Sequence, residues 1–239
     1  MEQMDATVQE MVQKRHRRRR AFVAGLVATC VLAGGAVAGV IVSTNASDLG
    51  AAPETVPSGT SGDKDGIRVA KGEVKVDVYF DYLCPECRRI EKEIAPELKS
   101  LQDDGKVTLV YHPVTFLDDY SEPSGYSTRA AEAAACAADA GAFDAYTAAL
   151  LERQPAEHGP GLSDAELVDL GRSVGVSDEG FADCVSSGRF SQWVKYVSDA
   201  AADDNVSMTP TVEVDGHSVD MTVANPADAV VDAVAKADR

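Results

Sequence analysis

The sequence predicts an α/β fold with an inserted helical subdomain, preceded by one transmembrane helix. Three observations lead to this prediction. An uncharged apolar run of 22 residues lies near the N-terminus, a strand–helix–strand pattern follows it, and a strand–strand–helix pattern ends the chain, with helical patterns between them. The 239 residues are 45% hydrophobic and 26% charged, which is typical of a globular protein and excludes wholesale disorder.

The net charge of −17 is unevenly distributed along the chain. Residues 1–20 are net positive because they contain a cluster of Lys and Arg, so the acidity lies in the rest of the protein. A protein that binds phosphate backbones needs a clustered positive surface. Nucleic acid is therefore not expected as a partner.

Residues 21–42 contain neither charge nor proline and directly follow four arginines, at positions 17–20. A helix of this length spans about 33 Å, the thickness of a hydrocarbon core, and flanking Lys and Arg stay in the cytoplasm. We expect residues 1–20 to be a cytoplasmic tail and residues 21–42 to be a single-pass anchor in the cell membrane. A cleaved signal peptide is the alternative, but the apolar run is longer than the usual signal core.

The segment after the predicted anchor, residues 43–71, is rich in Ser, Thr, Gly, Pro, Asp and Ala. A stretch with so few large apolar side chains does not offset its own ordering entropy. It is predicted to be a flexible extracytoplasmic linker, with the folded domain over residues 72–239.

The first part of that domain has a strand–helix–strand pattern. Residues 74–80 alternate and are rich in β-branched and aromatic side chains, which indicates a strand. After Cys84–Cys87, apolar residues recur at helical spacing, with Pro96 expected to kink the helix. Gly105 precedes a second predicted strand at residues 107–111.

The middle of the chain, from about residue 124 to 204, is predicted to be a helical insertion. Residues 128–140 are almost pure alanine, the best helix former, and Gly141 follows at the position of a C-terminal cap. Ser163 and Glu166 form a capping-box pattern at the start of a later helix. Further helices are expected over residues 142–152, after residue 177 and around residues 190–197.

The C-terminal part returns to strand signals. Residues 211–214 and 218–221 flank the turn dipeptide Asp215-Gly216, which predicts a hairpin. Asn225 and Pro226 then match an N-cap followed by proline at the first helical position.

Two cysteines stand two residues apart where a strand passes into a helix. At that position the helix dipole and free N–H groups lower the pKa of Cys84, and Pro85 restrains the loop, so Cys84 and Cys87 suit reversible disulfide formation. A zinc site would need two more ligands at matching spacing, and no metal is expected. A purely structural bridge is the other alternative, but so small a loop adds little stability.

The stretch Phe80-Asp81-Tyr82-Leu83-Cys84-Pro85-Glu86-Cys87, together with Met208-Thr209-Pro210-Thr211 before the hairpin, resembles the DsbA-like branch of the thioredoxin family. The resemblance covers roughly residues 70–237 in element order and is closest to membrane-anchored actinobacterial members. It implies a thioredoxin fold, Cys84 as nucleophile and Cys87 as resolving cysteine. It also implies a cis Pro210 against the active site, with Thr209 offering backbone hydrogen bonds to the substrate chain. No cofactor is implied.

One position departs from the family pattern. Many thioredoxin-fold enzymes have a buried acidic residue six positions before the first cysteine, where this chain has Val78. Asp77 and Asp81 flank that position. The resemblance therefore does not imply a proton relay through a buried carboxylate at position 78.

Cys136 and Cys184 remain after the active-site pair is assigned. In an oxidising compartment they are expected to form a structural disulfide, as similar actinobacterial proteins have an extra bridge. Two separate buried thiols are the alternative.

The resulting hypothesis is a membrane-tethered thiol-disulfide oxidoreductase that introduces disulfides into exported proteins with reduced cysteines. The family resemblance implies a quinone-linked membrane protein that reoxidises it. A reductase or isomerase kept reduced by a membrane electron donor, a non-catalytic holdase, and a reductase of small molecules or peroxide are alternatives. Glu86 is expected to disfavour a thiolate at Cys84 and to weaken oxidation, unless it points to water and its charge is screened.

Overall fold

The computed structural model describes residues 51–177 and 179–238. The predicted cytoplasmic tail, the predicted transmembrane helix and the first part of the predicted linker lie outside these residues. Among the residues that are described, no helix has the length and apolar character needed to cross a membrane.

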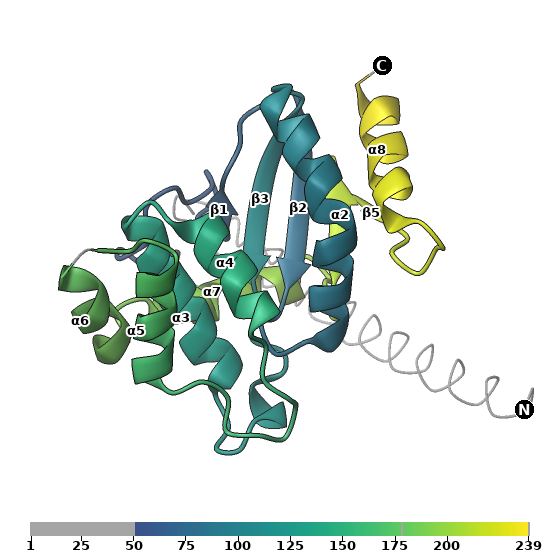
Figure 1. Cartoon of the computed structure of the whole chain (residues 1–239). Coiled ribbons are helices and arrows are strands. Elements are labelled where there is room, and N and C mark those ends of the chain that lie inside the picture. The colour runs from purple at the N-terminus through teal and green to yellow at the C-terminus, as the bar shows by residue number, and fades with distance from the viewer. Residues whose placement is uncertain (1–50, 178, 239) are drawn as a thin grey trace, which may run out of the picture. The chain divides into compact units, whose positions relative to one another are not determined.

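A five-stranded sheet with the order β1-β3-β2-β4-β5 forms the centre of the domain (Figure 1). The parallel strands β2 (Val74–Phe80) and β3 (Val107–Pro113) lie in the middle, and β4 (Thr211–Val214) runs antiparallel to β2. The edges are β5 (His217–Val219), paired with β4, and β1 (Ile67–Arg68), paired with β3. The central strands are buried on both faces, as expected where helices cover a sheet.

Two helices, α2 (Pro85–Asp103) and α8 (Pro226–Ala237), pack side by side on one face of the sheet (Figure 1). The insertion between β3 and β4 gathers toward the side of the sheet that carries β1. Its elements are a short 3₁₀ helix (Asp118–Tyr120), α3 (Tyr126–Asp139), α4 (Phe143–Glu152), α5 (Asp164–Ser173), α6 (Glu179–Ser187) and α7 (Ser191–Asp203).

The predicted order of strand–helix–strand, helical insertion and strand–strand–helix is confirmed. The capping box at Ser163 and Glu166 is present, and Asn225 caps α8 from the position before Pro226. At Pro96, the predicted kink position, α2 continues as one helix. The elements therefore follow the local sequence signals closely.

The segment before β1 differs from the flexible linker expected there. Ser61 N–H donates to the Gly66 carbonyl at 2.9 Å, Thr60 bridges to Ile67, and the Trp193 indole donates to the Lys64 carbonyl at 2.7 Å. These attachments use main-chain groups, which composition does not reveal because it counts only side chains. The structure therefore has hydrogen-bonded contacts before residue 72, within the segment predicted as a linker.

Helix α3 forms the centre of the insertion. Its alanines are fully or almost fully buried, and it contacts α4, α5, α6 and α7. Small side chains let several helices approach one axis closely. The alanine-rich composition thus serves packing as well as helix propensity.

Candidate active site at the Cys84–Cys87 pair

The two cysteines lie where β2 passes into α2. Cys84 is the N-cap residue of α2, with φ −72° and ψ 114°, and Pro85 occupies the first turn. The residue before a proline is kept out of the helical region, so Pro85 helps to hold Cys84 in this extended conformation. Both thiols are free, with 6% of Cys84 and 2% of Cys87 exposed.

The sulfur of Cys84 is surrounded by hydrogen-bonding groups. It accepts from the Cys87 N–H at 3.4 Å, and its thiol lies 3.5 Å from the Thr209 carbonyl oxygen. The hydrogen bond with the Cys87 thiol, helped by the main-chain N–H groups of Cys87 and Glu86, lowers the pKa of Cys84 to about 6. Cys84 is therefore mostly thiolate at neutral pH.

Cys87 has the opposite character. Burial raises the pKa of its thiol far above the ordinary value, and the neighbouring sulfur of Cys84 raises it further. The reduced pair thus holds one thiolate and one thiol. This asymmetry allows Cys84 to react as a thiolate while Cys87 stays protonated beside it.

Thr209 lies beside Cys84 through its carbonyl oxygen, and a cis peptide bond joins Thr209 to Pro210. The register explains their position, because Thr211 pairs with Tyr79 near the end of β2 from which the cysteines follow. Met208, directly before them, is 70% exposed. The structure thus brings Cys84, Cys87 and Thr209 together, with Pro210 directly after Thr209.

Glu86 lies on the exposed side of α2 and is paired with Arg89. The Arg89 Nε donates to the Glu86 carboxylate at 3.0 Å, which lowers the pKa of Glu86, and Arg89 also pairs with Glu93. The group of Glu86 that acts on Cys84 is its main-chain N–H. The geometry agrees with the screened alternative rather than with a carboxylate that opposes the thiolate.

Asp81 is a buried carboxylate three residues before Cys84. It accepts hydrogen bonds from the N–H groups of Leu83 at 2.8 Å and Leu117 at 2.9 Å, and from the Ser127 hydroxyl at 2.6 Å. Burial raises the pKa of Asp81 to about 6. The sequence indicated Asp81 only as a residue near Val78, the position that differs from the family pattern. In the structure, its hydrogen bonds to Leu117 and Ser127 connect the loop before Cys84 to the segment that follows β3.

Gln154 was missed by the sequence analysis. Its side-chain amide donates to the carbonyl oxygens of Tyr82 at 3.0 Å and Cys84 at 2.9 Å. A single polar residue just after the end of a helix carries no periodic signal, so nothing in the sequence marked it.

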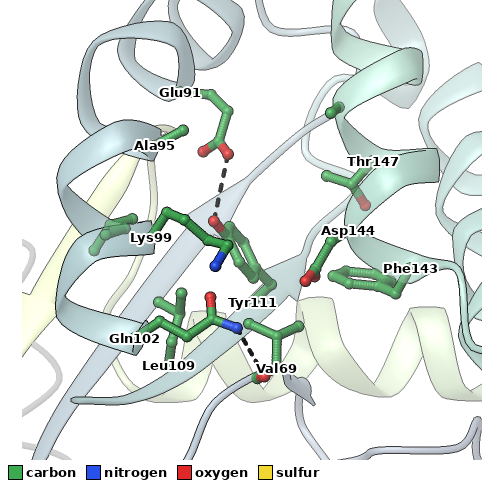
Figure 2. Close-up of a pocket in the computed structure, with 12 residues that line it drawn as sticks. Val69, Glu91, Ala95, Lys99, Gln102, Leu109, Tyr111, Phe143, Asp144 and Thr147 are labelled. Carbon is green, nitrogen blue, oxygen red and sulfur yellow. Dashed lines mark hydrogen bonds between the residues drawn. The ribbon is translucent and has the colours of Figure 1, made fainter. Parts of the chain in front are cut away.

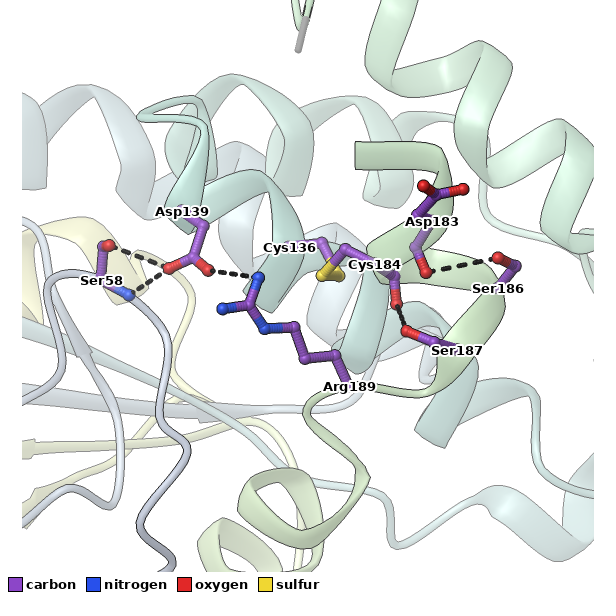
Figure 3. Close-up of a disulfide and its surroundings, with 8 residues drawn as sticks. All are labelled: Ser58, Cys136, Asp139, Asp183, Cys184, Ser186, Ser187 and Arg189. Carbon is purple, nitrogen blue, oxygen red and sulfur yellow. Dashed lines mark hydrogen bonds and ion pairs between the residues drawn. A yellow bond between two sulfur atoms is a disulfide. The ribbon is translucent and has the colours of Figure 1, made fainter. Parts of the chain in front are cut away.

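Cys136 and Cys184 are joined by a disulfide within the insertion (Figure 3). The bridge links α3 to α6 across 48 positions of sequence. Nearby, Asp139 accepts hydrogen bonds from the main chain and hydroxyl of Ser58 and pairs with Arg189. The disulfide is part of the scaffold and does not contact the two free cysteines.

A cavity of about 180 Å³ lies between α2, α4 and β3 (Figure 2). Its lining includes Glu91, Lys99, Tyr111 and Asp144 but neither cysteine. Over residues 51–177 and 179–238, no group of three or more His, Cys, Asp or Glu side chains is arranged to hold a metal ion.

Comparison with known proteins identifies the family. Residues 69–233 match the family model Thioredoxin_4, described as thioredoxin. The crystal structure of reduced DsbA from Mycobacterium tuberculosis is 34% identical, with a TM-score of 0.61 over 71% of this chain and 90% of that one. The chain belongs to the DsbA-like thiol-disulfide oxidoreductases of the thioredoxin family.

Two further comparisons place the DsbA-like domain among its relatives. The disulfide bond oxidoreductase DsbG from Mycobacterium tuberculosis, in its reduced form, is 34% identical, with a TM-score of 0.63 over 72% of this chain and 86% of that one. The serine/threonine-protein kinase PknE of the same species is 30% identical over 132 residues, which are 52% of this chain. The match spans only 23% of the kinase, so this chain is similar to one part of PknE and not to the whole kinase.

Proposed function

We propose that this DsbA-like enzyme works outside the cytoplasm and introduces disulfides into exported proteins. The observation that carries the proposal is the asymmetry of the two thiols, with a low pKa at Cys84 and a raised pKa at Cys87. A thiolate stabilised at Cys84 stabilises the reduced enzyme. A stabilised reduced form makes the disulfide form a stronger oxidant.

The reaction transfers two electrons from the substrate to the enzyme. A substrate thiolate attacks Cys84 of the Cys84–Cys87 disulfide, a substrate–Cys84 bond forms, and Cys87 leaves and takes up a proton. A second substrate thiolate then attacks the substrate sulfur of this mixed disulfide and expels Cys84 as a thiolate. The substrate leaves with one disulfide, and the enzyme is left as a dithiol.

The substrate chain is expected to lie along the segment that precedes β4. The thiol of Cys84 faces the carbonyl of Thr209, and Met208 beside it is exposed. We assign the main chain of Thr209 to hydrogen-bonding the substrate and Pro210 to holding that segment against the cysteines.

The location rests on two features of the chain. Disulfides persist in oxidising compartments, and the Cys136–Cys184 bridge suits such a place. The uncharged run at residues 21–42 follows a basic cluster, as in an anchor with its N-terminus in the cytoplasm. A membrane protein linked to quinone is proposed as the oxidant that takes the two electrons from the dithiol.

A trapping experiment tests the function. In the full chain with Cys87→Ala, the Cys84 thiolate can still attack a disulfide of an exported protein, and Cys87 is no longer there to attack the mixed disulfide and release that protein. This variant should therefore accumulate mixed disulfides between Cys84 and exported proteins. The matched control, Cys84→Ala with Cys87→Ala, should accumulate none. Trapping of no exported protein would contradict the proposal.

The redox state in growing cells decides the direction of the reaction. Alkylation of acid-quenched cells should find Cys84–Cys87 mostly oxidised. A mostly reduced pair would indicate a reductase or isomerase, and activity that survives Cys84→Ser would indicate a holdase.

A further inference from the structure

Gln154 reaches the active-site loop from the helical insertion. It lies two residues after α4, and its Nε2 donates to the carbonyls of Tyr82 at 3.0 Å and Cys84 at 2.9 Å. An amide nitrogen carries two hydrogens, so these two bonds use its full donor capacity. One side chain thus holds both ends of the segment Tyr82-Leu83-Cys84.

The carbonyl of Cys84 is also part of the helix that follows. It accepts the Arg88 N–H at a long 3.4 Å, which is the first main-chain bond of α2. The sulfur of the same residue accepts the Cys87 N–H. Any rotation of Cys84 that loses the Gln154 bond therefore also moves the sulfur relative to the first turn of α2.

Pro85 and Gln154 restrain different motions. Pro85 keeps Cys84 out of the helical region of backbone space, but it leaves a broad extended region open. The hydrogen bonds from Gln154 select one orientation of the Cys84 carbonyl within that region. The end of α4 is itself attached to α2, because Glu152 pairs with Lys92 at 2.6 Å and with Arg88 at 3.8 Å.

We propose that Gln154 is a positioning residue that holds Cys84 in the conformation in which its sulfur faces the N–H groups at the start of α2. Through this contact the insertion contributes to the reactivity of a cysteine that belongs to the thioredoxin core. The inference rests on the proposed use of the Cys84–Cys87 pair, but it concerns the properties of Cys84 and not the direction of the reaction.

The decisive variant is Gln154→Met, which keeps the length of the side chain and removes its donors without adding charge. Gln102→Met is the matched control, because Gln102 also donates from Nε2 to a main-chain carbonyl, that of Val69 at 3.4 Å, and lies at the far end of α2 (Figure 2). The pH profile of Cys84 alkylation in the reduced full chain is measured first. The equilibrium constant with glutathione is measured second.

We expect Gln154→Met to shift the alkylation profile to higher pH and to make the enzyme less oxidising by about two- to twelvefold, the range of one neutral hydrogen bond. Gln102→Met should match the wild type in both measurements. If Gln154→Met matches Gln102→Met in both, the proposal is wrong.

Stability is measured separately on the oxidised protein by denaturant unfolding, so that a general loss of folding is recognised. If Gln154→Met does not fold, Gln154→Asn replaces it, because its shorter amide does not span both carbonyls, and the same two outcomes apply. The alkylation profile needs no protein substrate. If the proposed oxidase function is wrong, the expected alkylation profile of Gln154→Met is therefore still the same.

Discussion

Cys84 owes its low pKa to hydrogen bonds and not to a neighbouring positive side chain. The groups that stabilise its thiolate are the Cys87 thiol and the main-chain N–H groups at the start of α2. Glu86, the charged residue inside the motif, is occupied by Arg89. The sequence between the two cysteines therefore acts through its backbone conformation more than through its charge.

The reduced enzyme should become more stable as pH rises from about 6 to about 9. The pKa of Cys84 falls from 9.0 to about 6 on folding, so the unfolded chain binds the extra proton in this range. The linkage amounts to roughly 1–2 kcal/mol at pH 7 and disappears below pH 6. Denaturant unfolding across this range should show the slope in the reduced wild type.

The oxidised protein and reduced Cys84→Ser are the controls for this slope, since neither has a thiol at Cys84 to titrate. An equal slope in reduced Cys84→Ser would show that other groups cause the pH dependence.

At the scale of single elements, strand β2 carries the buried carboxylate of Asp77 on the face away from α2. Asp77 accepts from His112 at 2.8 Å and pairs with Lys75 at 3.0 Å, and His112 also bonds to the Asp65 carbonyl at 2.8 Å. Burial is the largest single influence and opposes ionisation of Asp77, but the hydrogen bonds and charge interactions with His112 and Lys75 together outweigh it and lower the pKa of Asp77. This contact fixes β2 and β3 to the segment before β1.

Asp77→Asn should destabilise the fold by about 3 kcal/mol at pH 7, because it removes the carboxylate that binds the buried His112 side chain. Asp77 is only 3% exposed, so solvent does not compensate for the loss. Denaturant unfolding measures the effect, and Asp103→Asn, whose partner Lys99 is exposed, should show little change. If both substitutions lower the free energy of unfolding equally, the buried Asp77 contact stabilises the fold no more than the exposed pair does.

The elements that the sequence predicted are those with a periodic pattern or a local cap. Helices α2, α3 and α5 and strands β2 and β3 combine apolar periodicity with clear ends. Strand β1 has two residues, too few for any period, and its segment is attached through main-chain atoms. Such contacts depend on tertiary structure, which a pattern along one chain does not contain.

The site divides in the same way. Cys84, Pro85 and Cys87 are adjacent in sequence and were predicted from their spacing, and Pro210 was predicted from the family resemblance. Gln154 lies 70 residues after Cys84, and only the folded insertion brings it to the site.

At the scale of the whole domain, the active site is assembled from two parts. The thioredoxin core provides both cysteines and Thr209, while the insertion provides Gln154 and the Ser127 hydroxyl that binds Asp81. The insertion therefore contributes side chains that hold the active-site loop. Its stability affects how well the loop before Cys84 is held.

Removal of the Cys136–Cys184 bridge should destabilise the domain by about 4 kcal/mol by the chain-entropy model, because the bridge closes a loop across 48 positions. The double variant Cys136→Ala with Cys184→Ala is compared with the oxidised wild type by denaturant unfolding. The serine pair at the same positions tests whether the replacement itself matters. No loss in either pair would show that the bridge does not stabilise the fold.

The bridge also sets a condition on how the protein is made. The described residues contain four cysteines, and four cysteines allow three complete pairings. Only one of them joins Cys136 to Cys184 and leaves Cys84 and Cys87 to each other, while the other two cross-link the core to the insertion. Under the proposed function, a newly exported copy of this chain is therefore in the position of its own substrates, because it too must form one pairing out of three.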